Sequence, residues 1–419
     1  MKFLLALAGA ILTQSLVGQT SGEAKTPSPS PLAAEARFDH TLSGDWGGAR
    51  SALADHGLSL DLRYTQFFDG LLAGDLRSDA AFGSRIDAML TLDTGKLGLW
   101  QGGGLRTHLE SRFGDAPSQR GGALWPLNSG LALPLGGTER LVASSLYLTQ
   151  KFGADALLMV GKINAVDLLA SDPFFGGWGR DRFQNIAFVA PPSGVVPPTI
   201  MGAVLSLKQD PFAITFMAFD PDDRTNDYAP DDLFSRGVNL SLSVTWAGQV
   251  AGRASSVGVT GTYSTKDGAD LGQLLLPPEL RTGPRDGAFN VALSLSHLLL
   301  ESRQQSGKGL GVYVKAALAD GNPNPIQASV VAGLAGHGII PGRPRDSFGL
   351  GWFYYDFSDD LQDALAPALT FQDEQGLEFF YSCALTPWLA LGADLQWIDP
   401  ARGDQDTAVY AGLRTTITF

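Results

Sequence analysis

Cysteine is almost absent from this sequence of 419 residues, in which Cys383 is the single thiol. One cysteine rules out a disulfide within the chain and makes a zinc site built from thiolates implausible. Positive charge is also scarce: 30 Lys and Arg face 43 Asp and Glu, giving a net charge of −13 that argues against nucleic-acid binding. Charged residues make up only 17% of the chain, and this low content predicts a folded protein rather than a disordered one.

Long apolar runs are missing after the N-terminus. The best candidates, 290–300 and 350–355, are too short for a membrane helix of about 20 residues, so a bundle of membrane helices is excluded. The sequence also lacks a Gly-x-Ser-x-Gly elbow, a P-loop and histidines at metal-ligand spacing. We therefore expect no enzyme, cofactor or metal, although scattered carboxylate pairs leave a glycosidase open.

The first residues resemble an export signal. A short positive start at Met1 and Lys2 precedes an apolar stretch over 3–12 and small residues near 18–22. A stretch rich in Pro and Ser follows, and such a composition is typical of a flexible linker. We predict a secretory signal at 1–22, a linker at 23–41 and one folded domain at 42–419.

Apolar and polar residues alternate in many short segments of that domain. From Phe419 back to Val409, every second residue is apolar or Thr, and the intervening positions are mostly polar or small. Similar segments occur at 58–65, 85–93, 105–113 and 389–397, with turn residues between them. A strand that crosses a bilayer needs about 9–11 residues, so the domain has room for about 16 strands. The pattern predicts an all-β fold, a transmembrane antiparallel β-barrel with a wet lumen, and leaves open a soluble exported β protein that binds or hydrolyses sugars.

One short helix is expected before the first strand. Asp45 is a suitable N-cap, Trp46 to His56 forms the helix, and Gly57 supplies the left-handed stop. Its position before the barrel places it at the periplasmic end, where we expect it to brace the structure.

Several short motifs are distributed over the whole predicted domain. They are Ser43–Arg50 with Leu53 and Gly57, Gly161–Asn164, Asp167, Phe174, Phe183–Asn185, Arg343–Asp346, Gly349–Gly351, Glu378–Tyr381, Leu385–Leu389, Asp394–Gln396, Gly412–Arg414 and Phe419. These motifs resemble those of the carbohydrate-selective outer-membrane porins, the OprB family. The resemblance covers about 42–419 and implies a barrel of about sixteen strands in the bacterial outer membrane. It also implies passive diffusion of small sugars such as glucose, without catalysis or an energy source.

Alternation points one set of charged side chains into the lumen from two neighbouring strands. Arginine and carboxylate groups supply donors and acceptors that can replace the water around a sugar, and the family resemblance favours Arg85, Arg106 and Glu110. The alternative is that these residues only satisfy one another. The predicted constriction residues are Arg85, Asp87, Arg106, His108, Glu110 and Arg112.

The Gly-rich segment 172–185 is a second candidate. Folded into the lumen, it would offer Phe175 or Trp178 for stacking on a sugar and Arg180 and Arg182 for bonding its hydroxyls. The alternative is an extracellular loop with an interfacial aromatic residue. The acidic segment 220–232 is similarly open between a site for a divalent cation and a solvated loop.

The expected partners follow from these predictions. They are monosaccharides and small oligosaccharides, lipid and lipopolysaccharide, and the barrel assembly machinery, which would recognise the terminal strand ending at Phe419. The resemblance allows a monomer or a homotrimer. A general porin, an anion channel and an outer-membrane lipase remain alternatives, although the chain is short of Lys for an anion channel.

Overall fold

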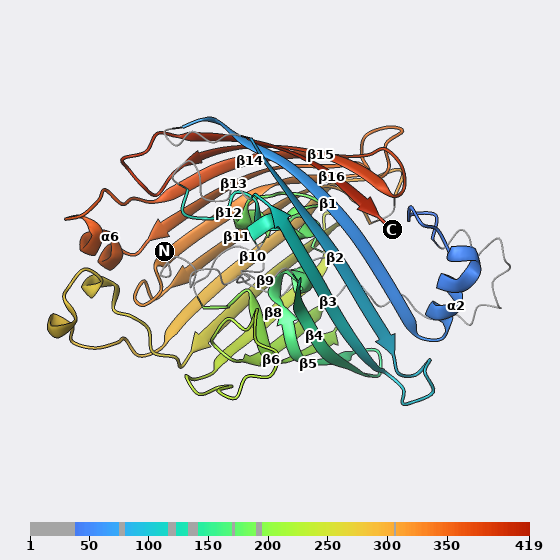
Figure 1. Ribbon diagram of the computed structural model, residues 1–419, viewed down its shortest axis with the longest axis horizontal. Helices are drawn as coiled ribbons and strands as arrows, with labels where there is room; N and C mark the ends of the chain where they lie inside the picture. The colour runs from blue at the N-terminus through green and yellow to red at the C-terminus, as the bar shows by residue number, and fades with distance from the viewer. Residues whose placement is uncertain are drawn as a thin grey trace.

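The computed structural model describes residues 38–74, 80–115, 123–132, 141–169, 172–189, 195–305 and 307–419. In these residues sixteen antiparallel strands form one closed barrel, in which each strand pairs with its sequence neighbours and β1 pairs with β16 (Figure 1). The fold predicted from the sequence is therefore confirmed. The predicted signal at 1–22 and most of the predicted linker lie outside the described residues.

The strands differ in length but follow the alternation of the sequence closely. Their bounds are β1 (Leu58–Ala73), β2 (Ala81–Asp93), β3 (Gly103–Gly114), β4 (Leu141–Phe152), β5 (Ala156–Asn164), β6 (Thr199–Gln209), β7 (Phe212–Phe219), β8 (Asn239–Val250), β9 (Arg253–Ser264), β10 (Ala288–Glu301), β11 (Gly309–Ala319), β12 (Ile326–His337), β13 (Ser347–Phe357), β14 (Glu374–Ala384), β15 (Leu389–Asp399) and β16 (Ala408–Thr418).

The two faces of the sheet are inverted relative to a water-soluble protein. In β8 the outward Leu242 is 51% exposed, whereas its inward neighbour Ser243 is 2% exposed. Outward apolar and inward polar positions alternate in this way along most strands. An exposed apolar belt of this kind faces lipid in a membrane barrel, and the polar face lines the lumen.

The two ends of the barrel carry different connections. At one end the turns are short, as at 210–211 and 251–252, and at the other end the loops are long, as at 220–238 and 265–287. The long-loop end carries the short helices η5 (Leu271–Gln273), η6 (Pro278–Leu280) and α6 (Asp359–Leu365), and the end of β16 lies at the short-turn end (Figure 1). No helix among the described residues is long and apolar enough to cross a membrane.

The N-terminal helix is present, but its start differs from the prediction. A 3-10 turn, η3 (Trp46–Gly48), precedes the α-helix α2 (Ala49–Asp55), because Trp46, Gly47 and Gly48 all have positive φ. Asp45 therefore does not cap a helix at Trp46, and it accepts hydrogen bonds from the Ser51 N–H and hydroxyl instead. The predicted left-handed stop at Gly57 is confirmed by its φ of 92°.

Arg50 explains why this helix lies against the barrel. Its guanidinium donates to the carbonyl oxygens of Leu60 at 2.7 Å and of Phe419 at 2.9 Å. Leu60 belongs to β1, and Phe419 follows β16 directly. The helix thus joins the two strands that close the barrel.

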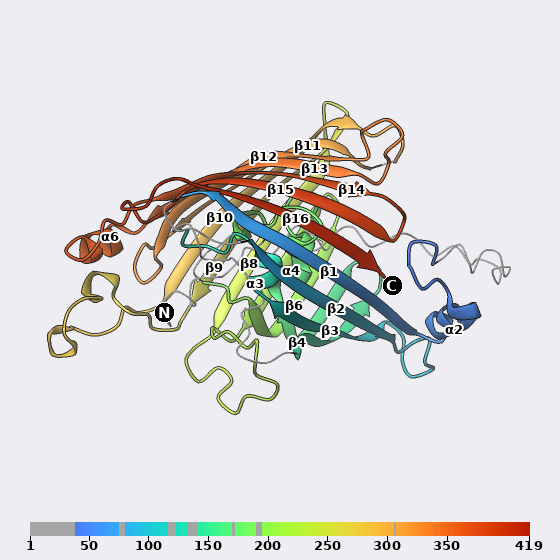
Figure 2. The same cartoon turned by 45° about the horizontal axis from the view of Figure 1, so that its top comes forward.

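Two segments fold into the barrel and fill part of its lumen. They carry the short helices α3 (Ser129–Ala132), α4 (Ala165–Leu169), η4 (Gly177–Gly179) and α5 (Ile186–Val189), and α3 and α4 lie inside the ring of strands in Figure 2. We use the name constriction segment for residues 165–169 and 172–189. Phe174, Phe183 and Phe188 from this segment form one aromatic cluster with Phe353 and Phe380 of the wall.

Glycine on the inner wall makes room for these rings. A Cβ at Gly349 would lie 2.7 Å from the Phe183 ring and 2.5 Å from the Phe380 ring. Both distances are shorter than van der Waals contact, so a larger residue at Gly349 is incompatible with the observed packing. The glycines of the predicted motif Gly349–Gly351 therefore serve the constriction segment.

Candidate functional site

Register pairing brings the predicted lumen charges of β2 and β3 together. Asp87 lies opposite Glu110, and Arg85 lies opposite Arg112. Alternation turns these side chains inward. The predicted patch on the lumen wall is therefore present, although its role in sugar contact stays a prediction.

The patch is an ion-pair cluster beneath the constriction segment. One terminal nitrogen of Arg85 lies 2.7 Å from an Asp87 carboxylate oxygen and 3.1 Å from a Glu110 oxygen. Arg180 of the constriction segment pairs with the other Asp87 oxygen. All four residues are 1% exposed. Because each buried charge here has an opposite partner, the cluster links the segment to the wall, and removal of one partner leaves an uncompensated charge.

His108 extends the same connection to α4. Its two ring nitrogens lie 2.8 Å from Asp167 and 2.9 Å from Asp87. Asp167 also accepts from the Trp178 indole at 2.7 Å and the Ser145 hydroxyl at 2.6 Å. Burial opposes ionisation of Asp167, but the neighbouring His108 and these donors hold the pKa of Asp167 below its usual range. A charged imidazole that donates to two carboxylates fits this geometry.

Three possible metal ligands meet in this cluster. Ligand atoms of Asp87, His108 and Glu110 all lie within 4.8 Å of one another, a grouping that spacing along the sequence did not reveal. The guanidinium groups of Arg85 and Arg180 already compensate the carboxylates and oppose an additional cation. The observed contacts therefore describe a salt-bridge cluster.

The remaining predicted residues have different surroundings. Arg106 is exposed and pairs in register with Tyr147 of β4. Arg112 donates to the Leu131 carbonyl, and Arg182 donates to the Phe175 carbonyl at 3.0 Å. Phe175 is 2% exposed in the core, below the Lys315 ammonium, so no free face of its ring meets a solute.

Trp178 is only partly available for stacking. The guanidinium of Arg180 covers its ring at 4.4 Å, and the His108 ring contacts it edge-on. The predicted infolding of 172–185 is observed, because Arg180 of this segment contacts β2 and Gln184 contacts β14. Stacking of Trp178 on a sugar stays a prediction.

Glu378 of β14 holds the other side of the constriction segment. Its two carboxylate oxygens accept the N–H groups of Gln184 at 2.5 Å and of Asn185 at 2.9 Å. The Asn185 amide donates to Gln396 of β15, which donates in turn to the Leu127 carbonyl. Sequence reasoning did not assign Glu378 or Gln396 to the site, although both occur in the motifs of the family resemblance.

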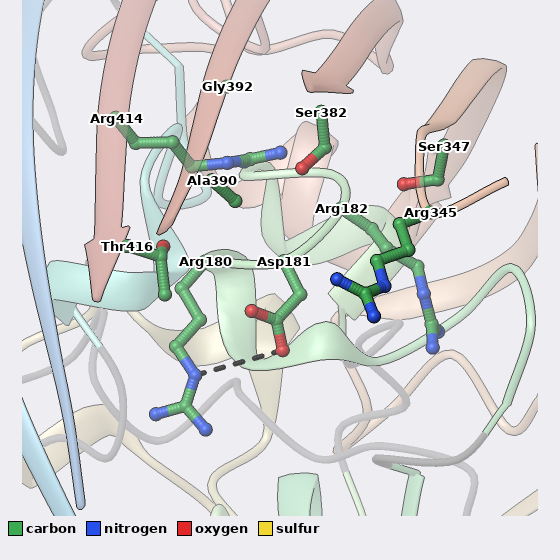
Figure 3. Close-up of a pocket in the computed structure, with 10 residues that line it drawn as sticks. All are labelled: Arg180, Asp181, Arg182, Arg345, Ser347, Ser382, Ala390, Gly392, Arg414 and Thr416. Carbon is green, nitrogen blue, oxygen red and sulfur yellow. Dashed lines mark ion pairs between the residues drawn. The ribbon is translucent and has the colours of Figure 1, made fainter. Parts of the chain in front are cut away.

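A cavity of about 200 Å³ lies between this segment and the wall of β13 to β16 (Figure 3). The lining strand residues lie toward the short-turn end. Four arginines and one aspartate supply the charge, and three hydroxyls supply neutral donors and acceptors. The lining residues are Arg180, Asp181, Arg182, Arg345, Ser347, Ser382, Ala390, Gly392, Arg414 and Thr416.

Four of the six aspartates in the acidic segment 220–232 form ion pairs within the chain. The Arg224 guanidinium pairs with Asp220 at 3.0 Å, Asp227 at 3.0 Å and Asp232 at 2.8 Å. Lys266 pairs with Asp222 at 2.7 Å. These contacts favour a loop held by its own ion pairs over a site for a divalent cation.

The closed sixteen-stranded barrel, its apolar outer belt and its internal segment define a porin of the outer-membrane type, a channel rather than an enzyme. The family model for the carbohydrate-selective porins, OprB family, matches residues 77–419, and the chain belongs to this family. The predicted membership is thus confirmed. A search of curated proteins finds no significant match.

Solved structures support the same fold. The high-pH structure of Pseudomonas putida OprB superposes with a TM-score of 0.77 and 20% identity, covering 91% of this chain and 99% of that chain. Its low-pH structure gives a TM-score of 0.58 and 17% identity, covering 91% and 98%. The outer membrane channel DcaP of Acinetobacter baumannii gives 0.52 and 12% identity, covering 86% and 97%.

Proposed function

We propose that this protein is a passive channel for small sugars such as glucose in the bacterial outer membrane. The observation that carries the proposal is the constriction segment, which is bound to β2 and β3 by Arg180 and Asp167 and to β14 by Glu378. A segment held on two sides narrows the lumen and gives the narrow part a fixed set of polar groups. The description of the family as carbohydrate-selective agrees with a sugar substrate.

The residues of the wall then have two kinds of role. Arg85, Asp87 and Glu110 are buried and paired, so we assign to them the fixation of the constriction segment. Arg106 and, at the edge of the cavity, Arg345 are exposed, and we assign to them the exchange of hydrogen bonds with a passing solute. Arginine suits this role because its rigid donor fork can bond adjacent hydroxyls. Binding must remain weak, since a channel has to release its solute.

The barrel architecture supports an orientation in the membrane. Outer-membrane barrels have short periplasmic turns and longer extracellular loops, so we place α2 and the end of β16 in the periplasm. The apolar belt then meets lipid and lipopolysaccharide. We further propose that the barrel assembly machinery recognises β16 and Phe419, and that the protein works as a monomer or a homotrimer.

Liposome swelling tests this proposal directly. We expect purified, refolded protein to admit glucose faster than a zwitterionic amino acid of similar size. Equal rates would instead indicate a general porin. No swelling with protein that shows the heat-modifiable gel shift of a folded barrel would contradict the channel and favour a soluble sugar-binding or hydrolytic function.

An Arg106→Ala variant tests the exposed part of the wall. We expect faster entry of larger solutes and a weaker preference for glucose, because an arginine side chain leaves the lumen. Arg253→Ala, beside the short turn at 251–252, is the matched control and should keep the preference of the parent protein. Unchanged selectivity in Arg106→Ala would remove this residue from the constriction.

A further inference from the structure

We propose that the cavity between the constriction segment and β13 to β16 binds the oxyanion of a small acidic sugar, a polyhydroxy solute with a carboxylate or phosphate group. The inference rests on the proposed sugar channel and specifies its substrate class. It starts from the cavity of about 200 Å³ that Figure 3 shows. This volume lies below the ~300–1,000 Å³ of drug-sized ligand sites, so a small solute suits it.

Charge is the first reason for an acidic solute. The lining contains four arginines, Arg180, Arg182, Arg345 and Arg414, and one aspartate, Asp181; Arg180 is already paired with Asp87, so three guanidinium groups remain for a solute. Asp181 already has a partner outside the lining, because Arg63 lies 3.1 Å from one of its oxygens. Burial opposes ionisation of Asp181, but Arg63 and Arg180 hold its pKa below the usual range, and it stays a paired anion. A chain of net charge −13 thus gathers positive charge at one point of its lumen.

Arg414 is the second reason. Its side chain extends from β16 over Ala390 toward Ser382 (Figure 3), and the residue is 3% exposed. Among the described residues, neither terminal nitrogen of its guanidinium has a hydrogen-bond acceptor. Buried donors without acceptors are costly, so this group is poised for an acceptor supplied by a solute.

The nearby carboxylates do not supply that acceptor. Glu378 accepts two backbone N–H groups of the constriction segment, Asp394 accepts from Gln396, and Asp69 accepts from Asn128. These three groups belong to the inner wall but not to the lining of the cavity. They balance part of the Arg414 charge and leave its terminal N–H groups free to bond an oxyanion.

The neutral groups of the lining fit the remainder of a sugar. Ser347, Ser382 and Thr416 each place a hydroxyl at the cavity, and hydroxyls both donate and accept. A carboxylate or phosphate can bond guanidinium forks in two parallel contacts while the sugar hydroxyls bond the serines and the threonine. A neutral sugar would use the second set of contacts only.

The experiment compares solutes of similar size in liposomes that contain the full-length, refolded protein. The probes are glucose, gluconate and glucose 6-phosphate, with acetate as an anion that lacks the polyol. We expect both acidic sugars to enter faster than glucose at low concentration, and their order identifies carboxylate or phosphate as the better ligand. Loss of the charged donors of Arg414 in Arg414→Gln should reduce gluconate entry about tenfold relative to glucose, which corresponds to about 1.4 kcal/mol.

A second variant distinguishes the loss of an anion-binding group from a folding defect. Arg345 is exposed at the edge of the cavity, so Arg345→Gln should fold normally and still lower the ratio of gluconate to glucose entry. Arg303→Gln is the matched control, an exposed arginine in another short turn outside the lining, and should leave the ratio unchanged.

The outcomes separate this inference from the sugar channel. If glucose enters and the acidic sugars show no advantage, or if neither arginine variant changes the ratio, the inference is overturned and the channel remains. If acetate gains as much as gluconate, the site selects charge alone and the assignment to acidic sugars is wrong. If no sugar enters, the proposed function itself fails.

Discussion

Two parts of the inner wall of this barrel share the alternation of inward and outward side chains but differ in the type of residue that points inward. On β2 and β3 the inward residues are charged and paired, as Arg85, Asp87 and Glu110 show. On β8 and β9 they are small hydroxyl residues, and Thr260 donates to Ser243 at 3.0 Å across the strands. Both sets of residues give the barrel the polar inner face that a membrane barrel with a wet lumen has.

The difference shows what the fold needs and what the channel adds. Serine and threonine on β8 and β9 bond one another across the strands, as Thr260 does with Ser243 and Thr262 with Ser241, so these hydroxyl pairs need no group from the constriction segment. The charged wall is complete only when Arg180 and Asp167 arrive from the constriction segment. Charge is therefore concentrated where a separate segment must be held in one position.

The largest effect is expected for Asp87→Asn, which removes the anion shared by Arg85, Arg180 and His108. Loss of one partner from a buried ion pair costs about 3–5 kcal/mol, so we expect a lower transition temperature in the heat-modifiable gel shift and faster entry of larger sugars. An unchanged transition temperature and unchanged size limit would show that the charged wall does not hold the segment. Asp399→Asn, at the end of β15, is the carboxylate control.

A smaller effect is expected for Gly349→Ala on the opposite side of the constriction segment. The new methyl group meets the Phe183 and Phe380 rings, and overpacking of this kind costs about 1–3 kcal/mol. We expect the barrel to form but the constriction segment to become more sensitive to added protease. Gly261→Ala in β9, whose Cβ has no neighbour within 4 Å, should retain the resistance of the parent protein. Equal protease sensitivity of the two variants would contradict the proposed packing role.

Acid should weaken the charged wall before the hydroxyl wall. The folded-state pKa values of Asp167 and Asp181 lie below the usual 3.8, so their ion pairs stabilise the segment fully above that pH. This stabilisation is lost as the pH falls through the lowered values, because the carboxylates then become protonated. We expect constant glucose entry between pH 7 and 5 and a changed size limit only below about pH 4. A change of the size limit near pH 6 would show that groups other than Asp167 and Asp181 determine the pH dependence.

The smallest effect is expected on the hydroxyl wall. A Ser243→Ala, Thr260→Ala double variant removes both partners of one hydrogen bond, which is nearly neutral, and we expect a change in the free energy of unfolding below about 1 kcal/mol. Rates for glucose and gluconate should match those of the parent protein in swelling assays. A clear loss of selectivity would show that sugars also contact this wall and would weaken the contrast between the two regions.

The sequence was sufficient for the barrel and for the neighbours within it. Alternation over 409–419 predicted β16 (Ala408–Thr418), and alternation over 85–93 and 105–113 placed Arg85, Asp87 and Glu110 on one patch. These results follow because side-chain direction in a strand has a period of two, which can be seen locally.

The parts that the sequence did not reveal depend on contacts between distant segments. Alternation shows that Arg85 points inward, but not that the distant helix α3 lies against it, where the Gly130 carbonyl accepts from its guanidinium at 3.0 Å. The same holds for Glu378, whose acceptors are occupied by backbone groups of Gln184 and Asn185. The helix start was misjudged for a local reason: Trp46 adopts a positive φ that its residue type does not suggest.

The contacts of Arg50 have a consequence for the order of assembly. The residue bonds Phe419 across a separation of 369 residues in the chain, and it also bonds Leu60 beside the seam of β1 and β16. This geometry is complete only after the last strand has joined the first, because neither strand alone presents both carbonyl groups. The N-terminal helix can therefore reach its observed position only on a closed barrel.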